Sequence, residues 1–539
     1  MKVRAKETVS MLTRDGVRLD ADVYRPTGEG EFPVLLMRQP YGRAIASTVV
    51  YAHPQWYAAR GYIVVIQDVR GRGTSEGEFK LFATEVEDGF DTVNWAASLP
   101  GSNGKVGMYG FSYQGMTQLY AASAKPEALK TICPAMVGYD LYRDWAYEGG
   151  AFCLQTNLGW AIQLATETAR LRGDEKAYLG LYSASRNLPL YDEIPAMPEI
   201  MKELAKDSFY GEWLANYLPG EYWQKLSPNL AEVDLPMLHI GGWFDAYLRG
   251  TINCYREMAN RSGFSQYLIV GPWAHLPWGR KVGAVDFGLA ALSPIDELQI
   301  QWFDRFLKEM DSGLLNKPPV CLFEMGSNLW REFDNWPRGE EKSYFLASTG
   351  LASLREDSGS LREDLAENCA EDLLIRDPWR PVPSLGGHAG LPAGSFERSA
   401  LDNRSDILTY TTAPLTEDLR VVGDVEIEIY AVADGPSFDL CAILSEVKKD
   451  GKVYNFTQGY RRVDSGDFPV KISLQATCIK LAKGNALRLS LSGDCFPAYA
   501  MNGGTGKSAG KTRLIDGKII TITVNCGGDF PSVIKFNLA

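Results

Sequence analysis

The sequence predicts an α/β protein in which a parallel sheet flanked by helices is interrupted by a helical insertion and followed by an all-β region. Three observations predict this class. Short, continuously apolar runs alternate with helical patterns in the first third of the chain, as buried parallel strands do. A long stretch of purely helical spacing follows. From about residue 317, short alternating runs are broken by Gly, Asp and Pro, which is typical of antiparallel sheets.

The first part of the predicted core spans residues 1–138. Its apolar runs are continuous rather than alternating, so both faces of each strand are expected to be covered. The expected strands are residues 32–38, 62–68, 105–110 and 128–135. The expected helices between and after them are residues 48–61, 85–100 and 112–127. This alternation predicts a parallel sheet.

Residues 139–227 are predicted to form a helical cap inserted in that core, because the strand signal disappears there and aromatic residues fall on the apolar side of helical patterns. Strands resume at residues 235–243 and 266–274, with a helical pattern between them. A long helical pattern over 293–313 closes the unit. We therefore assign residues 228–316 to the second part of the core.

Residues 317–539 are predicted to be an antiparallel β domain, either a sandwich or a jelly roll. The stretch 355–400 is rich in Gly, Pro and charged residues and is expected to be a long surface connection.

Composition restricts the function. The chain has 539 residues, 45% hydrophobic, with a formal net charge of −12, so it is expected to repel nucleic acid and anionic membrane. The first residues lack the apolar region of a signal peptide, and no apolar stretch approaches the roughly 18 residues of a membrane span. Nine cysteines without a CxxC pair favour reduced thiols. We therefore expect a cytoplasmic protein; self-association into a homo-oligomer stays open.

A serine between glycines stands at the junction of an expected strand and an expected helix. The segment "GFSYQG" (residues 110–115) puts Ser112 there. A sharp strand-to-helix turn exposes a nucleophilic serine above a parallel sheet and aims helix N–H groups at a developing oxyanion. The pattern departs from G-x-S-x-G, because Gln114 stands where the second glycine usually lies. The alternative is an ordinary turn in which Ser112 caps the helix.

A nucleophilic serine needs a base and an orienting carboxylate. Among the four histidines, His275 is the candidate base because it follows the last expected core strand, where catalytic groups of α/β folds lie. Asp245 follows the preceding strand and is the candidate carboxylate. The order Ser112, Asp245, His275 is that of hydrolases with this kind of turn. The other histidines fit less well: His53 precedes the serine, His239 falls inside an apolar run and His388 lies in the Gly-rich connection.

The chain resembles the cocaine esterase-like (CocE/NonD) hydrolases, which are related to Xaa-Pro dipeptidyl-peptidases and α-amino acid ester hydrolases. The matching segments are "RQPYGR" (38–43), "QDVRGRGTSEGEF" (67–79), "GFSYQG" (110–115), "GGWFDAYLRG" (241–250), "GPWAH" (271–275) and "FEMGSNLWREFDNWP" (323–337). They come in the family's order. The family's turn, G-x-S-Y-x-G, accounts for Gln114.

The resemblance implies an α/β-hydrolase core with an inserted helical cap and a C-terminal β jelly roll. It implies Ser112 as nucleophile, His275 as base and then acid, and Asp245 as orienting carboxylate. The oxyanion hole would be the backbone N–H of Tyr113 and the phenol of Tyr41, for which the alternative is a packed loop aromatic. No metal or organic cofactor is expected, since the sequence shows no metal-ligand spacing, GxGxxG segment or P-loop.

Other residues have more than one interpretation. Trp243 and Trp273 lie near Asp245 and His275 in sequence, and they either wall a substrate pocket or pack in the core. In "DVRGRGTSEG", the glycines suggest turns with positive φ, while Asp68 and Arg70 are expected to form a supporting ion pair.

For substrate we expect a neutral carboxylic ester, because no carboxylate follows Asp245 within residues 246–249. Relatives that favour a free α-amino group carry acids there, although the cap acids Asp140, Asp144 and Glu148 stay candidates for that role. An amide acylase or dipeptidyl-peptidase is the alternative, and a binding protein without turnover is a third possibility.

Overall fold

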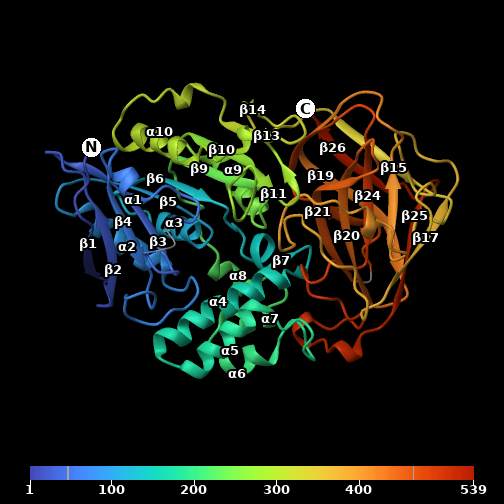
Figure 1. Ribbon diagram of the computed structural model, residues 1–539, viewed down its shortest axis with the longest axis horizontal. Helices are drawn as coiled ribbons and strands as arrows, with labels where there is room; N and C mark the ends of the chain where they lie inside the picture. Colours follow the sequence, from blue (N-terminus) through green and yellow to red (C-terminus); the bar gives the residue numbers. More distant parts are fainter. Residues whose placement is uncertain (45–47, 465) are drawn as a thin grey trace.

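The structure is a computed structural model that describes residues 1–44, 48–464 and 466–539. Figure 1 shows a first sheet with its helices, a group of helices beneath it and a β-rich domain beside both. The predicted fold class, an α/β core followed by a β-rich domain, is confirmed.

The first sheet has ten strands in the order β1-β2-β4-β3-β5-β6-β9-β10-β13-β14. The strands from β4 to β13 in that order run parallel, and β1, β2 and β14 are antiparallel to their neighbours. Their bounds are β1 (Glu7–Leu12), β2 (Arg18–Tyr24), β3 (Phe32–Gln39), β4 (Ile63–Asp68), β5 (Ser102–Phe111), β6 (Leu129–Ala135), β9 (Met237–Phe244), β10 (Gln266–Ala274), β13 (Val320–Glu324) and β14 (Leu329–Phe333).

Helices cover both faces of this sheet, which explains why its strands are continuously apolar. On β3, Val34 and Leu36 join the core on the face of α2 and α3, while Leu35 and Met37 join the core on the face of α1 and α10. The helices of this part are α1 (Pro54–Ala58), α2 (Glu85–Ala97), α3 (Tyr113–Ser123), α9 (Leu248–Arg261) and α10 (Ile295–Leu307).

The inserted segment packs against the α2–α3 side and shares its hydrophobic core. Its helices lie beneath the sheet in Figure 1. They are a π-helix (Tyr142–Ala146), α4 (Leu154–Arg172), α5 (Glu175–Arg186), α6 (Glu199–Leu204), α7 (Phe209–Ala215) and α8 (Glu221–Leu226). The segment also contains a short hairpin, β7 (Tyr147–Glu148) and β8 (Ala151–Phe152). The sequence did not predict it, because a strand of two residues is too short to show a pattern.

The β domain holds twelve strands around a second core. They are β15 (Glu341–Ala347), β16 (Ser360–Arg362), β17 (Ala370–Arg376), β18 (Ile407–Thr411), β19 (Leu419–Ala433), β20 (Ser437–Val447), β21 (Val453–Asp464), β22 (Val470–Ser473), β23 (Thr477–Leu481), β24 (Ala486–Ser492), β25 (Ile520–Cys526) and β26 (Val533–Leu538). The long strand β19 pairs with β22, β23, β25 and β26. A short helix, α11 (Ser399–Asp402), and a small hairpin near the core, β11 (Lys281–Val282) with β12 (Val285–Asp286), complete the strands and α-helices described.

Three expectations differ from the structure. Strands β13 and β14 extend the first sheet to residue 333, beyond the predicted boundary at 317, because β13 pairs with β10. The stretch 355–400 is not only a connection, since β16 and β17 within it belong to the β-domain sheet. The helix predicted over 48–61 is only α1, Pro54–Ala58.

Within the described ranges, no helix is both long enough and apolar enough to cross a membrane.

Candidate active site

The turn between β5 and α3 holds Ser112 in a strained conformation. Its φ is 60° and its ψ is −126°, a region that residues with a side chain rarely adopt. The backbone N–H of Ser112 donates to Ala135 O on β6 at 2.9 Å, which fixes the turn against the neighbouring strand. The Ser112 side chain makes no capping hydrogen bond. This geometry disfavours the helix-cap interpretation and leaves the hydroxyl available for chemistry.

Two glycines allow the turn to be this tight. A Cβ on Gly110, which has φ +141°, would lie 2.5 Å from Gln114 Cβ. A Cβ on Gly115 would lie 2.5 Å from Val137 Cγ1 and 2.8 Å from Ala135 O. The glycine needed for close helix–strand packing is therefore at position 115, which explains why Gln114 can replace the glycine of the usual pattern.

Asp245 and His275 meet at one edge of the sheet. Each follows the C-terminal end of a strand, β9 or β10, and these strands are parallel neighbours. His275 Nδ1 lies 2.7 Å from Asp245 Oδ1, so the Nδ1–H donates to the carboxylate and Nε2 is left to accept a proton. The Asp245 side chain is fully buried, whereas the His275 side chain is 31% exposed.

The imidazole of His275 lies beside the serine turn. Its ring centre is 5.4 Å from that of Phe111, the residue before Ser112. Within the residues described, no hydrogen bond joins His275 to the Ser112 hydroxyl. Such contacts often tighten only when substrate binds.

Tyr41 follows β3 at the same edge of the sheet, where its N–H donates to Gln39 Oε1 at 2.8 Å. Its phenol oxygen accepts a hydrogen bond from Trp160 Nε1 at 3.0 Å, so its own proton is left to donate elsewhere. Desolvation raises the pKa of Tyr41 to about 12, although the Trp160 hydrogen bond lowers it. Tyr41 is thus a neutral donor. The N–H of Tyr113 is at the first position of α3, where helix N–H groups lack partners within the helix.

A layer of aromatic side chains connects these groups, and the sequence did not predict it. Tyr247 lies edge-on to His275 at 5.1 Å and stacks on Trp145 at 4.1 Å. Trp145 packs against Trp160 at 5.3 Å, and Trp160 bonds to Tyr41. The cap tryptophans Trp145 and Trp160 therefore link Tyr247 to Tyr41 through ring contacts and one hydrogen bond. The only sequence signal for Trp160 was its place in a cap segment of helical spacing with aromatics on the apolar side, and Trp145 had none.

Trp243 and Trp273 pack in the core. Trp243 is 2% exposed and donates to Phe323 O at 2.7 Å, within the second hydrophobic core. Trp273 is fully buried, donates to Ala291 O at 2.8 Å and stacks on Trp278. These contacts account for both indoles and favour the core-packing alternative over the pocket wall.

The other histidines have structural partners. His53 Nδ1 accepts from Gln55 N at the start of α1. His239 is fully buried, and burial lowers its pKa to about 4. His388 Nε2 bonds to Glu148 Oε2 at 2.8 Å.

The cap acids are also engaged. Asp140 Oδ1 accepts from the N–H groups of the following turn. Burial raises the pKa of Asp144 to about 6, and its Oδ2 accepts from the Asp140 N–H at 2.9 Å. Burial would raise the pKa of Glu148, but His388 and Arg249 outweigh it and hold that pKa at about 2.

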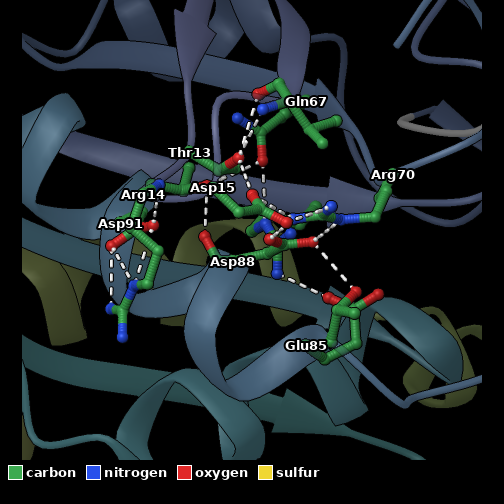
Figure 2. Close-up of polar contacts among 12 residues, drawn as sticks. Thr13, Arg14, Asp15, Gln67, Arg70, Glu85, Asp88 and Asp91 are labelled. Carbon is green, nitrogen blue, oxygen red and sulfur yellow. Dashed lines mark hydrogen bonds and ion pairs between the residues drawn. The ribbon is translucent and has the colours of Figure 1, made fainter. Parts of the chain in front are cut away.

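The segment "DVRGRGTSEG" supports the loop beside Tyr41. Gly71, Gly73 and Gly77 all have positive φ, as predicted. The predicted ion pair between Asp68 and Arg70 is wrong. Asp68 accepts from Arg43. Arg70 donates instead to Asp15 and Asp88, as Figure 2 shows.

Comparison with known proteins agrees with this architecture. Residues 15–277 match the model of the X-Pro dipeptidyl-peptidase (S15 family), and residues 312–535 match the X-Pro dipeptidyl-peptidase C-terminal non-catalytic domain. A cocaine esterase of Rhodococcus sp. (strain MB1 Bresler) is 30% identical over 97% of this chain and 96% of its own length.

Two crystal structures share the fold. An aminopeptidase from the marine sediment archaeon Thaumarchaeota archaeon superposes with a TM-score of 0.82 at 22% identity, covering 99% of this chain and 96% of that one. An α-amino acid ester hydrolase superposes with a TM-score of 0.80 at 22% identity, covering 100% and 97%. The sequence match to cocaine esterase and the two family models show that the chain belongs to the family of serine hydrolases that includes cocaine esterase and the X-Pro dipeptidyl-peptidases.

Proposed function

We propose that this protein hydrolyses carboxylic esters through an acyl-enzyme formed on Ser112. The observation that carries the proposal is the 2.7 Å contact between His275 Nδ1 and Asp245 Oδ1 at the edge of the sheet where the strained Ser112 lies. Strain at a single serine, next to a histidine already oriented by a buried carboxylate, is the arrangement that nucleophilic catalysis requires.

The reaction proceeds in two halves. His275 Nε2 takes the Ser112 hydroxyl proton as the oxygen attacks the ester carbonyl, and the leaving alcohol then receives that proton. Water repeats the sequence on the acyl-enzyme and releases the acid. The tetrahedral oxyanion accepts hydrogen bonds from Tyr113 N–H and Tyr41 O–H. Asp245 keeps the imidazole in the required tautomer and stabilises its charged form.

The hydrogen bonds of the cap acids favour esters over substrates with a free α-amino group. Asp140, Asp144 and Glu148 already accept hydrogen bonds from the protein. A carboxylate engaged in this way is a poorer partner for a substrate ammonium. We further propose a cytoplasmic location, supported by the nine cysteines, all of which are free thiols.

A serine-directed fluorophosphonate tests the proposal. We expect one adduct, located on Ser112 by peptide mass spectrometry, and no adduct in Ser112→Ala. If the folded protein were not labelled even with excess reagent, a binding protein without turnover would be favoured. Comparing p-nitrophenyl acetate and butyrate with glycyl-prolyl and glutaryl anilides then separates the reactions. Faster cleavage of either anilide would replace the esterase assignment with a peptidase or acylase.

A further inference from the structure

A buried cation in "DVRGRGTSEG" has no part in the chemistry proposed above. Arg72, in the loop after β4, is only 1% exposed. Its guanidinium carbon lies 3.7 Å from the ring centre of Phe79, and its Nη1 donates to Leu164 O at 3.2 Å. In the part of the chain that the structure describes, no carboxylate lies within ion-pair distance of it.

The lack of a counter-ion distinguishes Arg72 from its neighbours. Arg70 pairs with Asp15 and Asp88, and Arg43 pairs with Asp22 and Asp68. A guanidinium presents several N–H donors in a planar fork. Arg72 Nε is buried without a partner, and a buried, charged donor left unsatisfied is strongly unfavourable.

Arg72 also remains a cation. Burial lowers its pKa to about 10, which is still well above neutrality. The side chain therefore carries its charge under the conditions in which a cytoplasmic enzyme works.

Arg72 is one of the residues that line a cavity between the loop after β4 and the cap helices. The cavity has a volume of about 90 Å³ and lies between the loop after β4 and helices α4, α5 and α7. Its walls include Phe79, Leu164, Thr168, Arg172, Asp207 and Phe209. A cavity of this volume has room only for a small ligand, and its combination of apolar walls with a few polar groups is typical of ligand sites.

The acids around this cavity are already paired. Asp207 accepts from Arg172 Nη1 at 2.8 Å. Asp174 accepts from a backbone N–H at the start of α5. Glu167 accepts two hydrogen bonds from Arg170, at 2.7 and 2.8 Å. None of these carboxylates hydrogen-bonds to Arg72, so the cavity offers an unmatched positive charge.

The cavity lies near the proposed oxyanion hole. Its wall residue Phe209 packs against Trp160 at 5.1 Å, and Trp160 bonds to the phenol of Tyr41. Its wall residue Phe79 lies 6.2 Å from the ring of Tyr113. One aromatic layer separates the Arg72 cavity from the reacting centre.

We propose that this cavity binds a small organic carboxylate with Arg72 as its counter-ion. The planar fork of a guanidinium matches a carboxylate, and Arg72 has no carboxylate partner in the described part of the fold. The carboxylate has two possible sources. It belongs either to a free short-chain acid or to the far end of the acyl chain of a substrate. The second source rests on the proposed function; binding of a free acid does not.

Isothermal titration with glutarate and with its neutral analogue glutaramide tests the binding. We expect the wild-type chain to bind glutarate at one site and glutaramide at least about tenfold more weakly. Arg72→Gln should weaken glutarate binding by at least about tenfold. Arg172→Gln is the matched control, because Arg172 lines the same cavity but is exposed and already paired, and it should change the affinity less than about threefold.

Equal binding of glutarate and glutaramide by the wild type would overturn the proposal, and this comparison needs no variant. Undiminished glutarate binding by Arg72→Gln would also overturn it. If Arg72→Gln does not fold, Arg72→Lys replaces it, because lysine keeps the charge but lacks the planar fork. Its affinity for glutarate should lie between the affinities of the wild type for glutarate and for glutaramide.

Ester kinetics distinguish the two sources. If the substrate carries the carboxylate, the ratio of kcat/KM for 4-nitrophenyl hydrogen glutarate to that for 4-nitrophenyl valerate should fall at least about tenfold in Arg72→Gln. If Arg72→Gln loses glutarate binding but keeps the wild-type ratio of the two kcat/KM values, the site is assigned to a free acid. Absence of turnover of both esters would count against the proposed function alone, since the titration does not depend on catalysis.

Discussion

The phenol of Tyr113 donates a hydrogen bond to Glu85 Oε1 at 2.7 Å, and both side chains are buried. Glu85 Oε2 in turn pairs with Arg38, whose Nε donates to Gln67 Oε1 at 2.8 Å. Figure 2 shows Glu85 and Gln67 within this network. The residue whose N–H faces the proposed oxyanion is thus anchored through its side chain to the interior of the core.

We expect Tyr113→Phe to lower kcat about tenfold with little change in KM. The variant keeps the backbone N–H and the ring but frees the start of α3 from Glu85, and a misplaced donor weakens oxyanion stabilisation more than substrate binding. Leaving the buried Glu85 acceptor without this donor should also lower the free energy of unfolding by about 1–3 kcal/mol. Steady-state kinetics and urea unfolding measure the two effects.

Tyr120→Phe is the matched control for that variant. Tyr120 lies on the same helix, is 2% exposed and donates to Leu226 O at 2.6 Å. Losing this hydrogen bond in Tyr120→Phe should lower the free energy of unfolding to a similar extent, while kcat stays within about twofold of wild type. An equal fall in kcat in both variants would show that the effect of Tyr113 is general destabilisation rather than positioning.

Tyr41→Phe should lower kcat by about a hundredfold, from the loss of one oxyanion donor. Trp160→Phe removes the hydrogen bond to the Tyr41 phenol and part of the ring that packs against Trp145 and Phe209, but it keeps the phenol itself, so the loss in kcat should be smaller. Burst kinetics with p-nitrophenyl acetate separate acylation from deacylation in both variants. Full activity of Tyr41→Phe would remove Tyr41 from the oxyanion hole.

The sequence predicted the parallel part of the core well because strands buried on both faces are continuous apolar runs. It also predicted Ser112, Asp245 and His275 as residues at strand ends. The structure brings Asp245 and His275 into contact because their strands are adjacent. Which strands are neighbours depends on the topology of the whole sheet. From the sequence alone, the proximity of Asp245 and His275 could be inferred only from the chain order of Ser112, Asp245 and His275.

What the sequence could not predict depends on long-range packing. The aromatic layer of Trp145, Trp160 and Tyr247 joins the cap to the core, and no local period reveals which face of a cap helix meets the site. In the same way, β13 has the pattern of any antiparallel strand but pairs with β10. The bond between Glu148 and His388 joins residues 240 positions apart.

That bond gives a prediction for acid stability. Native interactions hold the pKa of Glu148 at about 2, below its ordinary value of 4.5. A carboxyl whose pKa is depressed by folding stabilises the protein fully above its unfolded pKa, and the contribution is lost as pH falls through the folded value. Glu148 should therefore steepen the fall in the free energy of unfolding between about pH 4.5 and pH 2, by up to about 1.4 kcal/mol per pH unit.

Glu148→Gln should remove this part of the slope and be less stable than wild type at pH 7. Urea unfolding at several pH values measures the difference between the two proteins, in which the many carboxyls they share cancel. Glu371→Gln is a control, since Glu371 is exposed on β17 and should leave the slope unchanged. Parallel slopes for wild type and Glu148→Gln would mean that the contacts of Glu148 with His388 and Arg249 do not stabilise the native state.

The last prediction concerns the glycine that replaces the usual one at the serine turn. In Gly115→Ala the new Cβ would meet Val137 Cγ1 at 2.5 Å and Ala135 O at 2.8 Å, so α3 must move away from β6. We expect a loss of about 1–3 kcal/mol in the free energy of unfolding from overpacking, even though alanine favours a helix over glycine by about 1 kcal/mol. Because α3 carries the Tyr113 N–H, kcat should fall as well.

Gly279→Ala, whose Cβ would meet nothing within 4 Å, is the control, and its free energy of unfolding should stay within about 0.5 kcal/mol of wild type. If Gly115→Ala were instead stabilised, helix propensity would outweigh packing there, and close approach would not explain the glycine.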